Sequence, residues 1–433
     1  MQTMKRILLR ALRHRNYRLF FIGQGISLIG TWMTRVAMSW LVYRLTHSAV
    51  LLGVVSFAGQ IPAFFIAPLA GVYIDRLNLH KILIATQILA MLQSLLLAVL
   101  ALTGTITIPQ ILLLSILQGL INGVDMPARQ SFMIHMVEDS ADLSNAIALN
   151  SSIVNGARLL GPSIAGLLIA VSGEGVCFLV DGVSYLAVIY CLYAMTVRKV
   201  DFKPVGNVLQ SLREGVEYAF GADSPIRSIL LLLAIVSFMG LPYMMLMPIF
   251  ADRLAGGGPQ ILGFLMGAAG LGALAAGLSL AARKHVRGLV RWMPLSTAIL
   301  GVSLIVFAFS HSLWLSLPLT VVAGYGMMME MAVSNTILQT IVDDNKRGRV
   351  MSFYTMSFVG MAPLGSLWAG FLAQKIGADH TLMIGGTACL TGALFFSLEI
   401  PRLRELIRPI YIRKGIIQKT LSGVQAAAAL SED

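Results

Sequence analysis

Two arginines stand inside long apolar stretches, where a positive charge needs a specific partner. Arg35 and Arg158 are each surrounded along the chain by aliphatic and aromatic residues. An arginine at the centre of a bilayer costs at least about 2.5 kcal/mol, so one that is kept there usually serves a purpose. Its guanidinium makes strong, two-pronged bonds to anionic groups. The chemistry that these residues can do is therefore the binding of an anion.

Polar residues accompany both arginines at helical spacing. At 100° per residue, Gln24, Ser27, Thr31 and Arg35 share an arc of about 80°, and Asn150 precedes Arg158 by eight residues. We interpret these stripes as the lining of a water-filled cavity that binds substrate. The predicted substrate-binding residues are Gln24, Thr31, Arg35, Asn150, Asn155, Arg158 and Tyr243. The alternative is a buried structural pair of Asp181 with Arg35 or Arg158, and the sequence favours neither interpretation.

Three acids lie within apolar stretches and are candidates for proton coupling. Asp125, Asp181 and Glu330 are carboxylates that could change charge when a cavity changes the side to which it opens. Asp125 follows Pro109 by 16 residues, about 24 Å along a helix, which places it toward one side of the membrane. That depth suits gating better than central proton binding. The sequence does not select which acid carries a proton.

Composition determines what must position these side chains. The 433 residues are 57% hydrophobic and 12% charged, with a mean hydropathy of +0.80, whereas soluble domains carry about 25% charged residues. The surplus apolar surface must face lipid. Cys177, Cys191 and Cys389 lie in apolar runs and suggest packing, not disulfides. We find no metal, phosphate-loop or nucleophile motif and expect no cofactor.

Twelve stretches have the length that a bilayer requires. They lie near 18–43, 48–74, 81–103, 109–128, 144–171, 175–197, 227–250, 260–282, 289–310, 313–341, 351–374 and 380–399. If the amino terminus is cytoplasmic, 27 of the 32 Lys and Arg residues fall in cytoplasmic segments. The net charge of +12 is thus an orientation signal, and we expect no nucleic-acid partner.

The longest connection divides the chain into two halves. We expect six spans in 1–197, a cytoplasmic linker with an amphipathic helix in 198–226, six spans in 227–400, and a poorly ordered basic cytoplasmic tail in 401–433. A repeat relates the halves: 130–139 aligns with 335–344 at an offset of 205, which places Asp125 on Glu330. Halves of six spans have the same orientation, which predicts a pseudo-two-fold axis along the membrane normal.

Several motifs together resemble the major facilitator superfamily, and within it the transmembrane secretion effector or enterobactin-exporter-like group of drug and siderophore exporters. The resemblance covers nearly the whole chain. The motifs are Gly30-Thr-Trp-Met-Thr-Arg-Val36, Gly71-Val-Tyr-Ile-Asp75-Arg76 with His80-Lys81, Asn122-Gly-Val-Asp125-Met-Pro-Ala-Arg129-Gln130, Asn145-Ala-Ile-Ala-Leu-Asn150, Gly161-Pro162 and Arg347-Gly-Arg349-Val-Met351.

The resemblance implies roles for some of these residues. It implies a cytoplasmic latch around Asp75, with an acid of the fourth span as relay and Leu79 at a position where the family usually has a basic residue. The gating or proton-coupling residues are then Gly71, Asp75, Arg76, Lys81, Asp125, Arg129, Asp181 and Glu330. The alternative for the loop residues is a set of solvated charges with a capping role. Gly161 and Pro162 match the motif of the fifth span and are expected to let that helix bend, with a packing kink as the alternative.

We therefore expect an all-α polytopic membrane protein of twelve transmembrane helices, and a secondary transporter that acts by alternating access. The resemblance makes it a proton-coupled exporter of a small amphipathic siderophore or drug, monomeric and in contact with membrane lipid, in the bacterial cytoplasmic membrane with both termini inside. A lipid or lysolipid flippase is the alternative within transport. A membrane-embedded enzyme is disfavoured, because the spans hold no cluster of catalytic residues. A non-transporting receptor is less favoured, because the ionisable residues in or near the helices would then need a structural explanation.

Overall fold

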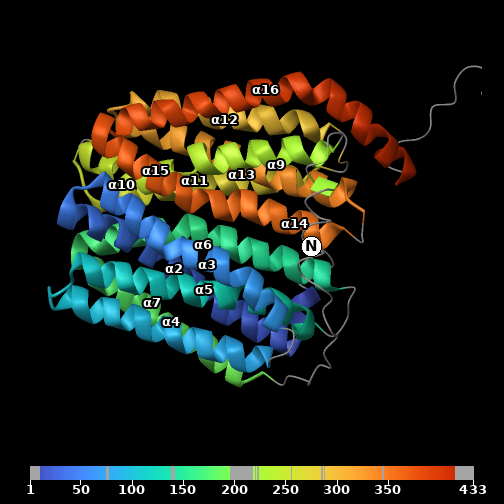
Figure 1. Ribbon diagram of the computed structural model, residues 1–433. Helices are drawn as coiled ribbons and strands as arrows, with labels where there is room; N and C mark the ends of the chain where they lie inside the picture. The colour runs from blue at the N-terminus through green and yellow to red at the C-terminus, as the bar shows by residue number, and fades with distance from the viewer. Residues whose placement is uncertain are drawn as a thin grey trace, which may run out of the picture.

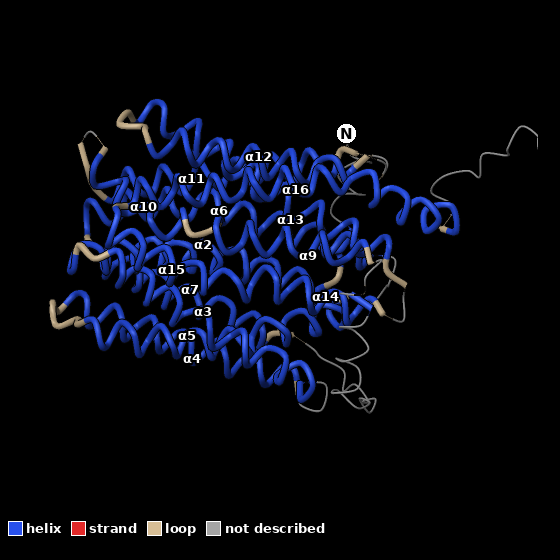
Figure 2. The backbone as a smooth tube through the Cα atoms, turned by 45° about the horizontal axis from the view of Figure 1, so that its top comes forward, coloured by secondary structure: helices blue, strands red, loops and turns tan. Residues whose placement is uncertain are grey.

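The computed structural model describes residues 10–74, 78–137, 142–195, 218–219, 221, 224–254, 256–283, 286, 288–343 and 346–414. Within these ranges the chain is almost entirely helical and has no strand (Figure 2). Because apolar helices satisfy their own backbone hydrogen bonds, this is the structure that a lipid-facing chain requires.

The first set of helices, α2–α7, follows the short helix η1 (Arg10–Arg13). Its members are α2 (Arg15–Thr46), α3 (Ala49–Ile74), α4 (Leu79–Leu102), α5 (Ile108–Met136), α6 (Leu143–Ser172) and α7 (Glu174–Tyr193). The predicted linker helix lies almost wholly outside the described residues.

The second set, α9–α16, contains two helices that are interrupted by π-helical turns. Its members are α9 (Pro225–Ile235), η3 (Val236–Gly240), α10 (Tyr243–Arg253), α11 (Pro259–Ala281), α12 (Leu289–Ala308), α13 (Leu313–Ile341), α14 (Arg347–Thr355), η4 (Met356–Gly360), α15 (Met361–Ile376) and α16 (Ala378–Arg413). In η3 the Leu241 amide donates to the Val236 carbonyl, five residues back, at 2.9 Å. Ser237 of η3 also donates to the Phe358 carbonyl of η4 at 2.5 Å.

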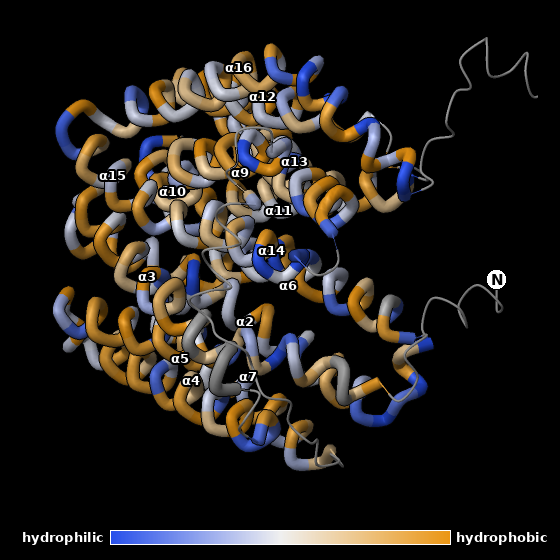
Figure 3. Tube along the Cα trace, turned by 45° about the vertical axis from the view of Figure 1, so that its right-hand side comes forward, coloured by the Kyte–Doolittle hydropathy of each residue, from blue (hydrophilic) through white to orange (hydrophobic). Residues whose placement is uncertain are grey.

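Eleven of the described helical segments are long and apolar enough to cross a membrane. The 32-residue helix α2 is not among them, since it carries Arg18, Gln24 and Arg35 along its length. Large apolar side chains such as Leu113, Val171 and Leu394 are exposed on the periphery. Figure 3 shows apolar residues predominating along the helices, with most of the hydrophilic ones toward their ends. This distribution matches a surface solvated by lipid.

The two sets of helices lie on opposite sides of the molecule and meet along two seams (Figure 1). Helix α6 packs along α11, and α3 packs along α15. The connections alternate between two ends of the bundle. We call them the α2–α3 end and the α3–α4 end after the first connection that each contains.

Glycines bring the two sets into backbone contact near the α2–α3 end. A Cβ on Gly166 of α6 would lie 2.6 Å from the Pro259 carbonyl and 2.8 Å from the Gly263 Cα of α11. On the other seam, a Cβ on Gly53 of α3 would lie 2.7 Å from the Ser366 carbonyl. Such distances exclude any side chain, so these glycines permit the close approach of the helices.

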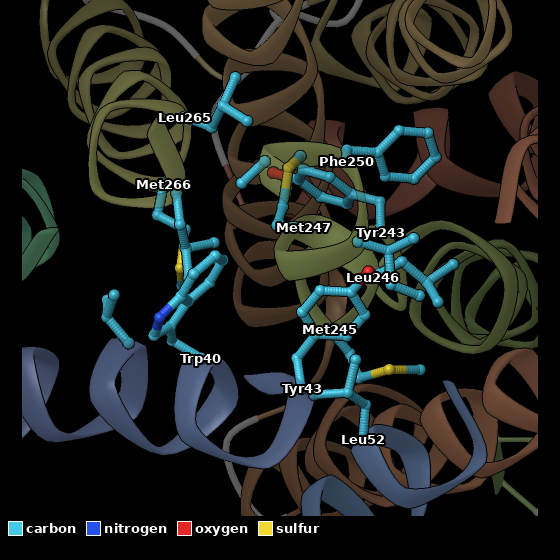
Figure 4. Packing of buried hydrophobic residues seen from close by; sticks show 14 of the residues in the cluster. Trp40, Tyr43, Leu52, Tyr243, Met245, Leu246, Met247, Phe250, Leu265 and Met266 are labelled. Carbon is cyan, nitrogen blue, oxygen red and sulfur yellow. The ribbon is translucent and has the colours of Figure 1, made fainter. Parts of the chain in front are cut away.

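Polar and aromatic contacts add to the closure of the α2–α3 end. The Tyr43 hydroxyl donates to Asp252 at 3.2 Å, and Gln374 accepts from the Ala49 amide at 3.1 Å. Figure 4 shows Trp40 and Tyr43 of α2 among side chains of α10 and α11. These residues belong to one buried cluster that also holds Met245. The first and second sets are therefore packed together at this end.

The helical end of the chain differs from the expected irregular tail. Helix α16 continues through Pro401 to Arg413. Leu403, Ile407 and Tyr411 recur every four residues, lie on one helix face and are buried. Arg413 bonds Asp343 at 2.7 Å, and the Lys414 ammonium donates to two carbonyls near the end of α13. These contacts stabilise the helix beyond the proline, while residues 415–433 lie outside the described range.

A pair of glycine variants in α6 tests the seam. We expect Gly166→Ala to lower the melting temperature of the purified protein, because overpacking of this kind costs about 1–3 kcal/mol. Gly156→Ala is the matched control: a Cβ there meets nothing within 4 Å, and alanine is the better helix former. Differential scanning fluorimetry in detergent measures both. Equal melting temperatures for the two variants would contradict the close contact.

Candidate functional site

Arg35 and Arg158 lie over the same indole ring. The Cζ atom of Arg35 is 4.7 Å from the centroid of Trp32, and that of Arg158 is 5.3 Å away. Trp32 and Arg35 are three residues apart on α2, and Arg158 comes from the middle of α6. The structure thus brings together the two arginines that the sequence singled out, through a tryptophan that the sequence analysis did not include.

A glycine of α6 makes room for this tryptophan. A Cβ on Gly161 would lie 2.5 Å from the Trp32 Cβ and 3.1 Å from the Ile29 carbonyl. Pro162 is inside α6, which runs without interruption from Leu143 to Ser172. The geometry therefore gives Gly161 a packing function between α2 and α6. Bending at Gly161 and Pro162 stays a prediction.

Neither arginine has an anionic partner within the described residues. No ion pair includes Arg35 or Arg158; Arg158 donates one bond, to the sulfur of Met328 on α13, at 3.7 Å. The Nε of Arg158 is buried and has no hydrogen-bond partner. Arg35 is exposed, although α2 packs along both α6 and α7.

Tyr243 lies near Arg158 and comes from the second set of helices. It begins α10, directly after the π-helical turn η3 and the Leu241-Pro242 step. Its side chain is 1% exposed and its hydroxyl has no hydrogen-bond partner. Arg158 is close enough to Tyr243 for an electrostatic interaction between the two. A donor hydroxyl without a partner and two guanidiniums therefore converge from both sets of helices.

The other predicted binding residues divide between two places. Asn155 lines a pocket of about 570 Å³ between α6 and helices α11–α13, toward the α3–α4 end, together with Ser151, Met328 and Thr336. Asn150 is half-buried, eight positions before Arg158 on α6. Thr31 donates to the Ser27 carbonyl at 3.1 Å within α2. Gln24 instead accepts a bond from Arg129 at 2.7 Å and lies away from the arginine pair.

Asp181 is buried but is not the partner of either arginine. Its Oδ2 accepts hydrogen bonds from Thr34 at 2.9 Å and Ser94 at 3.1 Å, and its Oδ1 is buried without a partner. The structural pair that the sequence left open is thus absent from the described residues. Asp181 ties α7 to α2 and α4 through neutral hydroxyls.

Among the described residues, Glu330 is the corresponding buried carboxylate without an ion-pair partner in the second set. It is fully buried on α13, and one oxygen accepts a hydrogen bond from Ser334 at 2.8 Å. Its other oxygen, Oε2, has no partner. Asp181 and Glu330 are therefore two buried carboxylates, one in each set of helices, and each has an unsatisfied oxygen.

Asp125 belongs to a different arrangement, a network that joins three helices. Arg129, one turn later on α5, forms an ion pair with Asp125. Thr86 and Gln87 of α4 each donate to the Oδ1 of Asp125 at 2.8 Å. Arg129 also donates to Gln24 of α2. This network is satisfied at the carboxylate, which distinguishes Asp125 from its repeat mate Glu330.

The predicted loop latch is only partly described. Asp75 and Arg76 lie outside the described residues, and for Gly71 only the helical backbone is described. Lys81 is exposed, and its amide donates to the side chain of Asn78, which caps α4. Latch roles for Gly71, Asp75, Arg76 and Lys81 remain predictions.

A larger cavity lies away from these residues. It has a volume of about 1,060 Å³ and runs between α9 and α16, from His380 to Glu399. Its lining is mostly apolar and includes Leu231, Ile384 and Phe395. Because exposed apolar surface at the periphery of this bundle faces lipid, we do not assign this groove to the substrate. The described residues contain no group of three side chains suited to a metal ion.

Known proteins resemble this chain over most of its length. Residues 8–409 match the family described as transmembrane secretion effector. The staphyloferrin A transporter of Staphylococcus aureus is 27% identical over 381 residues, which are 87% of this chain and 95% of that protein. The multidrug efflux pump Tap of Mycolicibacterium fortuitum is 25% identical, over 87% of this chain and 93% of that protein.

Solved structures share the fold. A peptide transporter POT in complex with alafosfalin gives a TM-score of 0.74 at 13% identity and covers 91% of this chain and 95% of its own. A bacterial homologue of the human lysosomal transporter Spinster, in an inward-facing and unoccupied conformation, gives 0.66 at 15% identity, with 91% and 98% covered.

The Asp125 network yields a stability prediction. Arg129→Gln removes the cation from a buried carboxylate, so we expect a loss of about 3–5 kcal/mol and a lower melting temperature. In the double variant Asp125→Asn, Arg129→Gln no charge is left unpaired, and most of the loss should be recovered. The same exchanges at the exposed pair Arg253 and Asp379 are the control and should cost no more than about 1 kcal/mol. If the double variant is as unstable as Arg129→Gln, the pairing argument fails.

Proposed function

The chain belongs to the transmembrane secretion effector family of the major facilitator superfamily, and from that premise we propose that it exports a small amphipathic compound, a siderophore or a drug, by alternating access. The observation that carries the proposal is the seam between the two sets of helices. It is packed closed at the α2–α3 end by glycines and aromatic residues, and it holds a pocket toward the other end. A secondary transporter alternates between this arrangement and its opposite.

We propose that α2 is a twelfth membrane span beside the eleven apolar ones. Residues 1–197 and 227–400 then form two six-helix bundles, related by a pseudo-two-fold axis along the membrane normal. Residues 198–226 link them, and the basic segment after residue 400 begins as the continuation of α16 to Arg413. The excess of Lys and Arg supports a cytoplasmic α3–α4 end and cytoplasmic termini in the bacterial inner membrane. Because one chain supplies both sides of the seam, we propose a monomer.

The compound to be exported enters from the α3–α4 end. It passes Asn155 and the pocket between α6 and α11–α13, and it binds where Arg35, Arg158 and Tyr243 converge. Rocking of one bundle against the other then closes this path and separates the glycine seam at the α2–α3 end. The Asp125 network, which joins α2, α4 and α5, keeps the first bundle rigid during this movement.

Proton coupling is assigned to Asp181 and Glu330. Each is buried and has one oxygen without a partner, and a proton is the smallest group that satisfies such an oxygen. Asp125 does not need a proton, because its carboxylate already has an ion pair and two hydrogen bonds. A gradient of protons directed inward would then drive the outward movement of the exported compound.

Export is testable in inside-out vesicles. We expect accumulation of at least one of three probes, namely a labelled catecholate siderophore, a labelled macrolide and a fluorescent lipophilic cation, and only with an imposed proton gradient. Arg35→Ala should abolish accumulation at unchanged expression, because it removes a charge from the binding site. Arg253→Ala, at an exposed ion pair of the α2–α3 end, is the control. No accumulation of any probe in vesicles that contain folded protein would refute export of these classes.

Coupling has a separate test. Asp181→Asn and Glu330→Gln keep the size of each side chain and remove the carboxylate that binds the proton. We expect each to reduce gradient-driven accumulation at least tenfold, while exchange of internal for external probe without a gradient continues. Asp379→Asn, an exposed carboxylate, should behave like the wild type. Full gradient-driven transport by both of the first two variants would remove these acids from the mechanism.

A further inference from the structure

The arginine pair at the seam defines the charge of the compound that the site can hold. Two guanidiniums share one indole ring, and their Cζ atoms are no more than 10.0 Å apart. They are close enough to interact as like charges. A cation over an aromatic ring gains about 0.5–2 kcal/mol, but this attraction does not neutralise two positive charges inside a membrane protein.

The protein supplies no counter-charge from its own buried acids. Asp181 is bonded to Thr34 and Ser94, Asp125 is paired with Arg129, and Glu330 is bonded to Ser334. No carboxylate in the described residues forms an ion pair with Arg35 or Arg158. Because like charges in a medium of low dielectric repel strongly, the site is most stable when an anion occupies it.

The shape of the site selects among anions. A guanidinium presents parallel N–H donors that match the two oxygens of a carboxylate. Two such groups on different helices, one on α2 and one on α6, match two carboxylates of one molecule. The buried hydroxyl of Tyr243 adds a donor without a partner, and Met328 adds an apolar, adaptable surface for a carbon skeleton.

We propose that Arg35, Arg158 and Tyr243 form a binding site for a polycarboxylate, in which each guanidinium holds one carboxylate of the same molecule. This rests on the proposed export function and narrows its substrate class to compounds with at least two carboxylates. Trp32 positions the two arginines, and Gly161 fixes the place of Trp32 against α6. The site is accessible through Arg35, which is exposed to solvent.

Binding of tricarballylate, a small tricarboxylate, tests the site without transport. Isothermal titration calorimetry on the protein in phosphatidylcholine nanodiscs should detect binding of tricarballylate and none of its trimethyl ester, which has the same skeleton without charge. Arg35→Gln and Arg158→Gln should each raise the Kd about tenfold or more, since each removes a charge-assisted pair. The double variant should not bind, and Arg253→Gln should bind as the wild type does.

Folding of the variants is checked by their melting temperatures without ligand. Removing an unpaired charge should leave this temperature unchanged or raise it, whereas a structural role for the arginines would lower it. Equal binding of the acid and its ester, or equal Kd values for the wild type and both single variants, would overturn the proposal. A third outcome would also overturn it: tricarballylate binding that is lost only when phosphatidylglycerol is added and that is the same in the wild type and the arginine variants. Tricarballylate would then bind elsewhere on the protein, at a place where a lipid headgroup competes with it.

The two proposals fail separately. If the vesicles accumulate the macrolide or the lipophilic cation while tricarballylate does not bind, export stands and the polycarboxylate site is wrong. If tricarballylate binds through both arginines while no compound accumulates, the site stands and export is wrong. Inhibition of siderophore accumulation by tricarballylate, but not by its ester, would support both.

Discussion

Close contact between glycine backbones is the constraint on which the rest of this molecule depends. At Gly166 and Gly263, and again at Gly53 and Gly370, two helices approach so closely that no side chain fits between them. On the seam of α6 and α11 this close approach continues as far as Gly270, where a Cβ would lie 2.6 Å from the Arg158 carbonyl. Farther toward the α3–α4 end, Ser151, Ser152 and Asn155 of α6 line the pocket that lies between α6 and α11–α13. One end of the seam is therefore packed, and the other is hollow.

The geometry of the proposed binding region depends on the same kind of contact. Gly161 lets Trp32 approach α6, and Trp32 in turn places Arg35 and Arg158 on one ring. Both arginines belong to the first set of helices, and Tyr243 and Met328 reach them from the second. A ligand held there touches both sets at once. Its binding free energy then depends on their relative position, which is the coupling that an alternating-access cycle needs.

Much of this was available from the sequence, because a bilayer imposes long apolar helices and makes each buried charge conspicuous. The helices, the connection between the halves and the two arginines follow from that rule alone. The contacts that the buried charged residues make with other helices could not be predicted in this way. Asp181 was considered as a mate for Arg35 or Arg158, but its oxygens face Thr34 and Ser94. Helical spacing shows which residues share a face, whereas contacts between helices depend on their rotation about their own axes.

Trp32 could have been found from the sequence, since it stands three residues before Arg35 on the same face. Gln24 shares the stripe of Arg35 but lies about three turns toward the other end, where it accepts a hydrogen bond from Arg129.

The π-helical turn η3 has a consequence for the angular phase of its helix. A turn closed by a bond over five residues accommodates one residue more than an α-helical turn, so everything after it is rotated by about 100° relative to an unbroken helix. Tyr243 comes three residues after the end of that turn, behind Leu241 and Pro242. The direction of the Tyr243 hydroxyl at the seam therefore depends on the extra residue that the backbone accommodates between Val236 and Gly240. Its neighbour η4, bonded to it through Ser237 and the Phe358 carbonyl, shifts the phase of α15 in the same way. In two helices of the second set, the segment after the π-helical turn is therefore rotated about the helix axis relative to the segment before it. Different helix positions then face inward on the two sides of the turns, and this change occurs at the same depth in both helices.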